Sequence, residues 1–205
     1  MENFIFQNPV KILFGKGTIP AIDGEVPKQA RVLIAFGGGS AEKNGTLTQV
    51  RAALKGRTIF EFGGIEPNPA FETLMKAVDL ARKEKIDFIM AVGGGSVSDL
   101  AGFVAHTWMR GIGLVIVPTT LLSMIDASIG GKNAIDIGYA KNVVGSFHLP
   151  TDIICDVGWL PSLSEKDLAA GMAEAIKHAV LDSEEHFRFF EQIAAARIQL
   201  AQMSG

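Results

Sequence analysis

The sequence is poor in cysteine, in aromatic residues and in excess charge. Cysteine occurs once among 205 residues, at Cys155, so an internal disulfide cannot form and a cysteine-based zinc cluster is excluded. Nineteen lysines and arginines oppose 22 aspartates and glutamates, for a net charge of −3. Neither this balance nor any local basic tract favours nucleic acid as a partner.

Long apolar runs are also lacking. No stretch approaches the roughly 18 residues that a membrane span requires, and the first residues lack the basic region and apolar run of a signal peptide. We therefore expect no membrane partner and a cytoplasmic location. Hydrophobic residues still make up 48% of the sequence, so the chain can bury a core.

Glycine, in contrast, is abundant and clustered, with 23 copies. Short apolar runs that end at glycine clusters are typical of buried strands, and they cover 31–36, 57–62 and 86–92. Helical spacing of apolar residues predicts helices over 69–85 and 96–110, and a further strand follows at 113–117. This alternation indicates βαβ units and a parallel sheet, and residues 4–14 are expected to form a preceding β-ribbon.

The pattern changes near residue 150. A last short strand at 152–155 is followed by helices over 164–181 and 184–202, the first capped by Ser164 with Asp167 three residues later. We therefore predict an α/β dinucleotide-binding domain over 1–160 and the first helices of an incomplete α-helical metal and substrate domain over 161–205. The last helix carries apolar residues at near-helical spacing that need a partner, namely Phe187, Phe190, Ile193 and Ala194.

Two glycine runs lie where a strand gives way to a helix. Glycines there let backbone amides approach a phosphate, and the helix N-terminus adds partial positive charge. A tight turn between strand and helix explains the run at 93–95 equally well, and neither run is the G-x-G-x-x-G fingerprint. The candidate contacts are Gly38, Ser40, Gly94, Gly95 and Ser96. No acid follows the first of these strands, and Ser40 with Lys43 would tolerate the 2′-phosphate of NADP.

Residues 118–148 combine hydroxyls, an acid, an amide and two lysines on what we interpret as glycine-bearing loops. The side chains are those of Thr119, Thr120, Asp126, Lys132, Lys141 and Asn142. Open α/β sheets bind ligands at the carboxyl ends of their strands, and lysine supplies a point charge for phosphate or carboxylate. The alternative is that both lysines are solvated surface cations. On the following helix, Glu174, Lys177 and His178 share one face, either as metal ligands or as an ordinary ion pair with a helix-end histidine.

These motifs resemble two branches of one superfamily. Residues 1–99 are similar to the nucleotide-binding domain of iron-dependent alcohol dehydrogenases of the NADPH-dependent type, through 12–17 (ILFGKG), 61–69 (EFGGIEPNP) and 91–97 (AVGGGSV). Residues 99–190 resemble 3-dehydroquinate synthase, through 99–105 (DLAGFVA), 117–122 (VPTTLL), 130–132 (GGK), 141–142 (KN) and 173–177 (AEAIK). The resemblance implies a Rossmann-like parallel-sheet domain followed by the start of a helical domain.

The resemblance also implies roles for single residues. NAD would be held by Gly94, Gly95, Asp99, Thr119 and Thr120, with Asp126 beside cofactor or substrate. The substrate, an anionic seven-carbon sugar-acid phosphate, would be held by Lys132, Asn142 and Lys177, with Lys141 nearby. Arg110 would reach a phosphate in the other subunit of a homodimer. Glu174 would be one of three protein ligands to zinc or another divalent metal.

The implied reaction is a cyclising elimination of phosphate in which NAD⁺ transiently oxidises a secondary alcohol. In that family the other two metal ligands are histidines of a downstream helical domain, and none of the four histidines here lies in that motif. We therefore expect weak or no turnover from this chain alone. Two alternatives stay open. The first is an iron-dependent alcohol dehydrogenase relative that reduces aldehydes with NAD(P)H. The second is a non-catalytic nucleotide-binding fragment or chimera.

Overall fold

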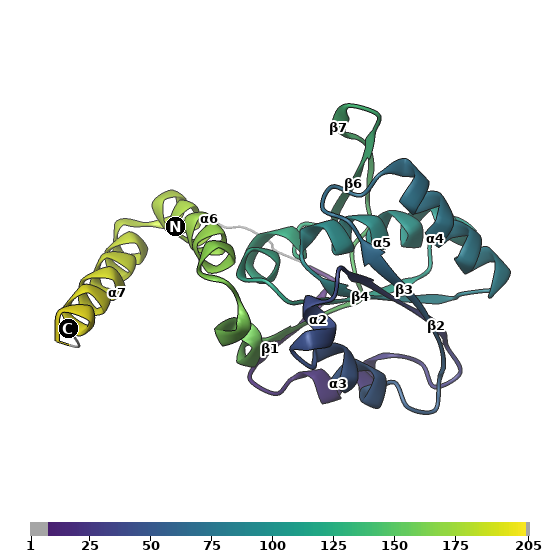
Figure 1. Cartoon of the computed structure of the whole chain (residues 1–205), viewed down its shortest axis with the longest axis horizontal. Coiled ribbons are helices and arrows are strands. Elements are labelled where there is room, and N and C mark those ends of the chain that lie inside the picture. The colour runs from purple at the N-terminus through teal and green to yellow at the C-terminus, as the bar shows by residue number, and fades with distance from the viewer. Residues whose placement is uncertain (1–7, 204–205) are drawn as a thin grey trace, which may run out of the picture.

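The sheet is entirely parallel and forms the centre of the molecule. The computed structural model describes residues 8–203, with side-chain burial as far as residue 195. The strand order is β1-β8-β5-β4-β2-β3, and every neighbouring pair is parallel (Figure 1). The strands are β1 (Lys11–Gly15), β2 (Arg31–Gly37), β3 (Thr58–Ile65), β4 (Phe88–Gly93), β5 (Gly113–Pro118) and β8 (Asp152–Asp156).

Helices cover both faces of this sheet (Figure 1). On one face lie α4 (Phe71–Lys83) and α5 (Gly95–Thr107), packed on Leu33, Ile89 and Leu114. The opposite face is covered by η1 (Ile19–Ala21), α1 (Ile22–Glu25), α2 (Ser40–Lys43) and α3 (Thr46–Ala53). All six residues of β4 are buried, because a parallel strand covered on both faces has no solvent side. The predicted α/β fold with a Rossmann-like parallel sheet is confirmed.

Two strand predictions need correction. The first predicted strand is not a ribbon: β1 pairs in parallel with β8 at one edge of the main sheet, and residues 4–7 of the predicted segment lie outside the described residues. Gly63 and Gly64 do not end their strand either, since β3 continues through them to Ile65. The register of β3 with β2 shifts at these glycines, between the pairs Ala35–Phe62 and Gly37–Ile65, so they mark an irregularity in the strand and not its end.

The strand order reverses direction between β2 and β4. The chain leaves β2 toward β3 on one side, and after α4 it returns to place β4 on the other side of β2. Ligands of open α/β sheets bind at such a reversal, outside the carboxyl ends of the strands. Both predicted glycine runs, 37–39 and 93–95, follow the carboxyl ends of these two strands. The topology therefore brings both runs to the same edge of the sheet, on neighbouring strands.

The segment predicted as lysine-bearing loops is mostly a β-hairpin, which projects from the sheet domain (Figure 1). Strands β6 (Lys132–Ile137) and β7 (Ala140–Phe147) pair antiparallel, with Lys132 opposite Phe147. The turn is made at Gly138, whose φ of 59° suits glycine. The loop interpretation of Lys132, Lys141 and Asn142 was wrong because frequent glycines and polar residues obscure the two-residue alternation of this ribbon.

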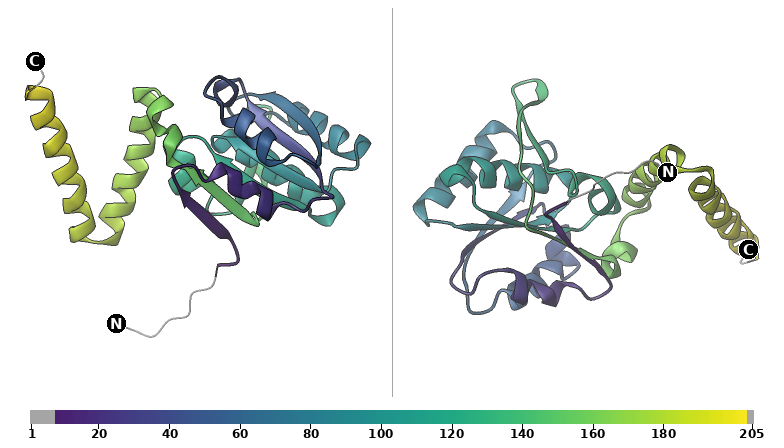
Figure 2. Two further views of the ribbon diagram at one scale, coloured as in Figure 1. Left: turned by 90° about the horizontal axis from the view of Figure 1, so that it is seen from below. Right: turned by 180° about the vertical axis from the view of Figure 1, so that it is seen from behind.

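Two helices follow η4 (Val157–Ser162) and extend away from the sheet domain as a V (Figure 2). These are α6 (Glu165–Asp182) and α7 (Glu184–Met203), close to the predicted bounds. The predicted cap is present, because the Ser164 hydroxyl accepts a hydrogen bond of 3.1 Å from the Asp167 amide. Within residues 8–203, no helix combines the length and apolarity needed to cross a membrane.

Candidate functional site

The glycine turn at 93–95 joins β4 to helix α5. Gly94 caps α5, and the Gly93 carbonyl accepts a hydrogen bond of 2.9 Å from the Thr119 amide, which fixes the end of β5 against the turn. A Cβ atom on Gly94 would lie 3.5 Å from Thr120, and one on Gly95 would lie 3.5 Å from Ala127. These are ordinary van der Waals distances, so the turn lies next to Thr120 and Ala127, and its backbone amides stand at the positive end of a helix of 13 residues.

A polar pocket of about 450 Å³ opens beside the first turn of α5, and we call it the lysine pocket. It gathers four predicted site residues, Asp99, Asp126, Lys132 and Asn142. The rest of its lining is Ala127, Gly130, Asn133 and Ala134. Lys132 thus stands on the same side of the sheet as the glycine turn, as the sequence-based hypothesis requires.

Two other residues of the hairpin differ from what the sequence predicted about the lysine pocket. Lys141, on β7, is exposed and does not line the lysine pocket. Asn133 does line the lysine pocket, although sequence reasoning missed it. The residue is 5% exposed, and its Nδ2 donates a hydrogen bond of 3.0 Å to the Gly131 carbonyl. A Cβ atom on Gly102 of α5 would lie 1.8 Å from the Asn133 side chain. Gly102 therefore lets the hairpin sit directly on α5, a contact whose only sequence signal is a glycine inside a helix.

Asp99 is the acid with the most perturbed ionisation in this site. Burial raises the pKa of its carboxyl to about 6, and a hydrogen bond from the Ala134 backbone offsets part of that effect. A carboxyl in this range is partly protonated near neutrality. It can therefore either donate or accept a hydrogen bond at the edge of the lysine pocket.

A second polar pocket, of about 600 Å³, lies between the loop after β2 and the start of α6. It brings together Ser40, Thr119 and Thr120 with Lys43, and its remaining lining is Asn44, Ser162, Leu163, Ser164 and Asp167. Asp167 is the one acid of this lining, and its carboxylate accepts a hydrogen bond of 2.7 Å from the Ser164 hydroxyl. Gly38, in the loop after β2, is exposed and does not line the pocket.

Glu42, the acid next to Lys43 in the sequence, is paired with an arginine. The Glu42 carboxylate forms an ion pair of 2.9 Å with Arg51, which also binds Glu61 at 2.7 Å. The hydrogen bond from Arg51 lowers the pKa of Glu42. Lys43 is therefore the one cationic side chain lining the second pocket, with a neighbouring acid that is already paired.

Three potential metal ligands come from two parts of the chain. Asp126 belongs to η3 (Ser123–Ala127), which follows β5, whereas Glu174 and His178 lie one turn apart on α6. One ligand atom from each lies within 4.8 Å of the others, and His178 Nε2 is 3.9 Å from Asp126 Oδ1. Lys177 forms an ion pair with Glu174, and this contact raises the pKa of the Lys177 ammonium. Sequence reasoning named Glu174 and His178 as possible metal ligands and placed Asp126 beside cofactor or substrate.

Two predicted contacts involve other parts of the fold. Ser96 accepts a hydrogen bond of 3.3 Å from the Asn68 amide, so its hydroxyl ties the loop before α4 to the turn. Arg110 ends η2 (Trp108–Arg110), beyond the far end of α5, and is exposed. A helix of 13 residues is about 20 Å long, so Arg110 lies away from the glycine turn of its own chain. A role for Arg110 in a neighbouring subunit stays a prediction.

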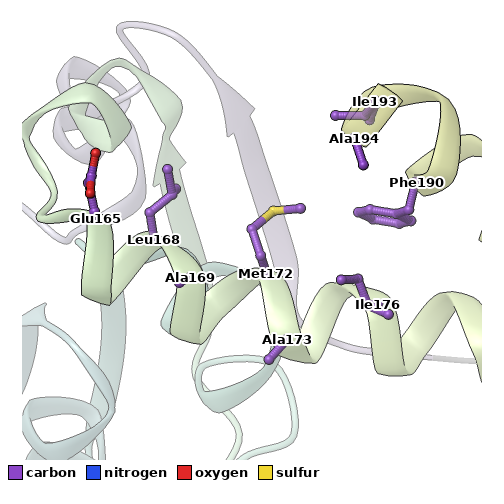
Figure 3. Close-up of a pocket in the computed structure, with 9 residues that line it drawn as sticks. All are labelled: Glu165, Leu168, Ala169, Met172, Ala173, Ile176, Phe190, Ile193 and Ala194. Atoms are coloured by element: carbon purple, nitrogen blue, oxygen red, sulfur yellow. The ribbon is translucent and has the colours of Figure 1, made fainter. Parts of the chain in front are cut away.

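An apolar groove of about 540 Å³ separates α6 from α7 (Figure 3). Met172 and Ile176 of α6 face Phe190 and Ile193 of α7 across it. Glu165 is the one ionisable residue of its lining, so this groove lacks the groups for acid–base or metal chemistry. Three of the four predicted apolar residues of the last helix line it, whereas Phe187 lies elsewhere on α7.

Comparison with curated proteins gives relatives of two kinds. Over 105 residues, which are 51% of this chain and 27% of the relative, the chain is 57% identical to the NADPH-dependent aldehyde reductase YqhD of Escherichia coli strain K12. Over 111 residues, which are 54% of this chain and 31% of the relative, it is 50% identical to the 3-dehydroquinate synthase of Symbiobacterium thermophilum.

Solved structures give a reductase and a different synthase. The substrate- and cofactor-free aldehyde reductase YqhD from E. coli superimposes with a TM-score of 0.72 and 35% identity, over 94% of this chain and 56% of the reductase. The 2-epi-5-epi-valiolone synthase ValA of Streptomyces hygroscopicus, solved with NAD⁺ and Zn²⁺ bound, gives a TM-score of 0.73 and 25% identity over 87% of this chain and 51% of ValA. The chain thus spans about half of these structural relatives.

The family follows from the segment that holds most of the site. The sequence model described as 3-dehydroquinate synthase N-terminal matches residues 66–170. This match includes the glycine turn, both threonines and the whole lysine pocket. The chain therefore belongs to the 3-dehydroquinate synthase N-terminal family.

Proposed function

We propose that this chain forms the nucleotide-binding half of a lyase that acts like 3-dehydroquinate synthase, with NAD(P) and a divalent metal, on an anionic sugar-acid phosphate. The observation that carries the proposal is the lysine pocket, where Lys132, Asn142 and Asp126 meet beside the glycine turn. An ammonium group and an amide suit a substrate that carries phosphate, carboxylate and hydroxyl groups, and both Lys132 and Asn142 are exposed and so accessible to it.

The turn between β4 and α5 would hold the pyrophosphate of a dinucleotide. The glycine turn offers backbone amides at the N-terminus of α5, next to Thr120 and Ala127. Thr119 and Thr120 can place their hydroxyls toward the second pocket, which they line together with Ser40. The relative ValA binds NAD⁺ in the same fold, which supports a dinucleotide at this edge of the sheet.

The donor set also fits a divalent metal. Carboxylate oxygens and an imidazole nitrogen are ligands that Zn²⁺ accepts, and ValA carries Zn²⁺. Such a cation, when bound, would supply Lewis-acid polarisation of a substrate oxygen. The side chains of this chain do the rest: Lys132 binds the anionic group, Asn142 orients hydroxyls, and Asp99 holds or releases a proton at its carboxyl.

A second function, NADPH-dependent aldehyde reduction, is favoured by one observation. The chain is 57% identical over 105 residues to a reductase of that type. The second pocket agrees with NADP, since Lys43 lines it with Ser40 and no acid follows β2 before the glycine run. A neutral aldehyde, however, has no use for the cation that Lys132 places in the lysine pocket.

The experiment that separates these functions uses Lys132→Ala, with Lys83→Ala at the far end of α4 as the matched control. Calorimetry first measures NAD⁺ and NADPH binding to the unsubstituted chain. We expect binding of one or both dinucleotides, and of the seven-carbon sugar-acid phosphate in their presence. Lys132→Ala should weaken sugar-acid phosphate binding at least tenfold and leave dinucleotide binding unchanged.

Three results would count against the synthase-like proposal. Absence of heat with both dinucleotides would leave a non-catalytic module. Equal sugar-acid phosphate affinity in Lys132→Ala and Lys83→Ala would remove the role of the lysine pocket. NADPH-dependent reduction of butanal that survives Lys132→Ala would favour the reductase.

A further inference from the structure

We propose that Asp136, on strand β6 of the hairpin, is a positioning residue that holds Asn142 at the lysine pocket. This deepens the proposed function and rests on it, because Asn142 is proposed there to orient hydroxyl groups of the sugar-acid phosphate. The Asp136 carboxylate accepts a hydrogen bond of 2.9 Å from the Asn142 backbone amide. Sequence reasoning named Asn142 but not Asp136, because the contact joins two strands of a hairpin that was interpreted as loops.

Asn142 lies in an irregular part of the hairpin. The register shifts there, so that Asp136 of β6 alone faces residues 141–143 of β7. The surplus residues of such a bulge leave the regular ladder, and their backbone amides need other acceptors. For Asn142, the middle residue of the three, the side chain of Asp136 supplies that acceptor.

The backbone of Asn142 adopts a conformation that needs support. Its φ of 53° falls in the left-handed region, which side chains other than those of asparagine and aspartate rarely visit. This tolerance explains why an asparagine can stand here, but it does not set the direction of the side chain. Asn142 is exposed and lines the lysine pocket together with Lys132 and Asp126. Its direction therefore depends on a backbone that the hydrogen bond to Asp136 restrains from across the ribbon.

Asp136 is itself attached to the sheet domain. Its amide donates a hydrogen bond of 3.3 Å to the Pro69 carbonyl, and it forms a parallel bridge with Ala70. The Ala70 amide donates in turn to the Glu66 carboxylate at 2.9 Å. A residue that lay only on the projecting hairpin would move with it, whereas Asp136 is held by the loop before α4.

The loop that holds Asp136, residues 66–70, also contacts the glycine turn. The amide of Asn68 donates a hydrogen bond of 3.3 Å to the hydroxyl of Ser96, in the first turn of α5. A series of direct contacts therefore runs from the glycine turn through this loop to Asp136 and on to Asn142. Asn142 is thereby placed relative to the proposed dinucleotide site, as a reaction between substrate and cofactor requires.

The charge of Asp136 does not explain its place. A carboxylate near the pocket repels a phosphate, so direct binding of the anionic substrate is not its role. An amide oxygen accepts the same hydrogen bond without the charge. The substitution Asp136→Asn therefore keeps the bond and removes the charge, whereas Asp136→Ala removes both.

Two measurements on the full chain test this role. Hydrogen exchange followed by NMR, without ligand, should show the Asn142 amide exchanging about three- to tenfold faster in Asp136→Ala and unchanged in Asp136→Asn. Calorimetry with the seven-carbon sugar-acid phosphate, in the presence of NAD⁺, should show affinity lower by a similar factor in Asp136→Ala and not lower in Asp136→Asn. Tyr139→Ala, an exposed side chain at the hairpin tip, is the matched control and should match the unsubstituted chain in both.

A double-substitution cycle separates positioning from a general loosening of the hairpin. Asn142→Gly keeps a residue that suits the left-handed conformation but removes the side chain, and it should weaken sugar-acid phosphate binding by itself. In that background Asp136→Ala should have no further effect on affinity, because no side chain is left to position. Loosening of the hairpin would instead weaken binding by the same factor in both backgrounds.

Each contrary result has a definite meaning. Unchanged exchange of the Asn142 amide in Asp136→Ala would show that the hydrogen bond does not restrain the backbone. Equal affinity of Asp136→Ala and the unsubstituted chain, an equal loss in Tyr139→Ala, or the same loss in the Asn142→Gly background would each overturn the positioning role. An unsubstituted chain that binds no sugar-acid phosphate would refute the proposed function, and hydrogen exchange alone would then decide whether Asp136 holds Asn142.

Discussion

Ionisation of Asp99 should lower the free energy of unfolding as the pH rises. The substitution Asp99→Asn should remove this pH-dependent loss of stability. Burial raises the pKa of Asp99 to about 6, above its ordinary value of 3.8. The folded chain therefore binds this proton more tightly than the unfolded chain does. The stabilising contribution of Asp99 is fully present below about pH 4, falls as the pH rises toward 6, and is lost above that pH.

The magnitude follows from the difference between the two pKa values. About two pKa units correspond to ~3 kcal/mol, which is an upper limit because water reaches part of the side chain and screens the charge. We expect about 1–2 kcal/mol. The Asn side chain has nearly the same shape, keeps an acceptor for the Ala134 amide and carries no charge.

Urea unfolding of both proteins between about pH 4 and pH 8 measures this effect. The two should be equally stable near pH 4, and Asp99→Asn should be more stable by about 1–2 kcal/mol near pH 8. Asp79→Asn, an exposed acid on α4, is the control and should show no such trend. A stability difference for Asp99→Asn that stays constant across the pH range would refute the assigned cause.

Three further substitutions test the packing that positions the site. Gly171→Ala would put a Cβ atom 2.6 Å from Leu121, so calorimetry should show a loss of about 1–3 kcal/mol and hydrogen exchange a loosened α6. Arg57→Ala removes a fully buried guanidinium that bonds the Val26 carbonyl, and chemical unfolding should show a loss of about 2–4 kcal/mol. Asp156→Ala frees three backbone amides near the end of β1, with a similar expected cost in urea unfolding.

The strands and helices of the sheet domain were predictable because their patterns are local. β2, β4 and β5 are continuous apolar runs, and α6 has a capping serine at the expected place. Helix α3 was missed because its buried stripe of Leu47, Val50 and the following Leu54 spans only two turns. Periodicity over so short a segment does not separate helix from loop.

The strand order could not be predicted from the sequence, because it depends on contacts between distant segments. Nothing in the residues of β8 says that this strand inserts between β1 and β5, since all three are short and apolar. The hairpin shows the same limit. Its seat on α5 depends on Gly102 yielding space to Asn133, two residues that are unremarkable in isolation.

The candidate site was likewise predictable only in part from the sequence. Residue types and resemblance named Lys132, Asn142 and Glu174, and the fold gathers the first two in one pocket. What they could not provide is the meeting of Asp126 with Glu174, because one follows a strand and the other lies on a later helix. Asp126 also lines the lysine pocket, so one carboxylate stands between the proposed anion site and the proposed cation site. A substrate bound to Lys132 would thus lie next to the metal ligands, which is the arrangement that the proposed chemistry requires.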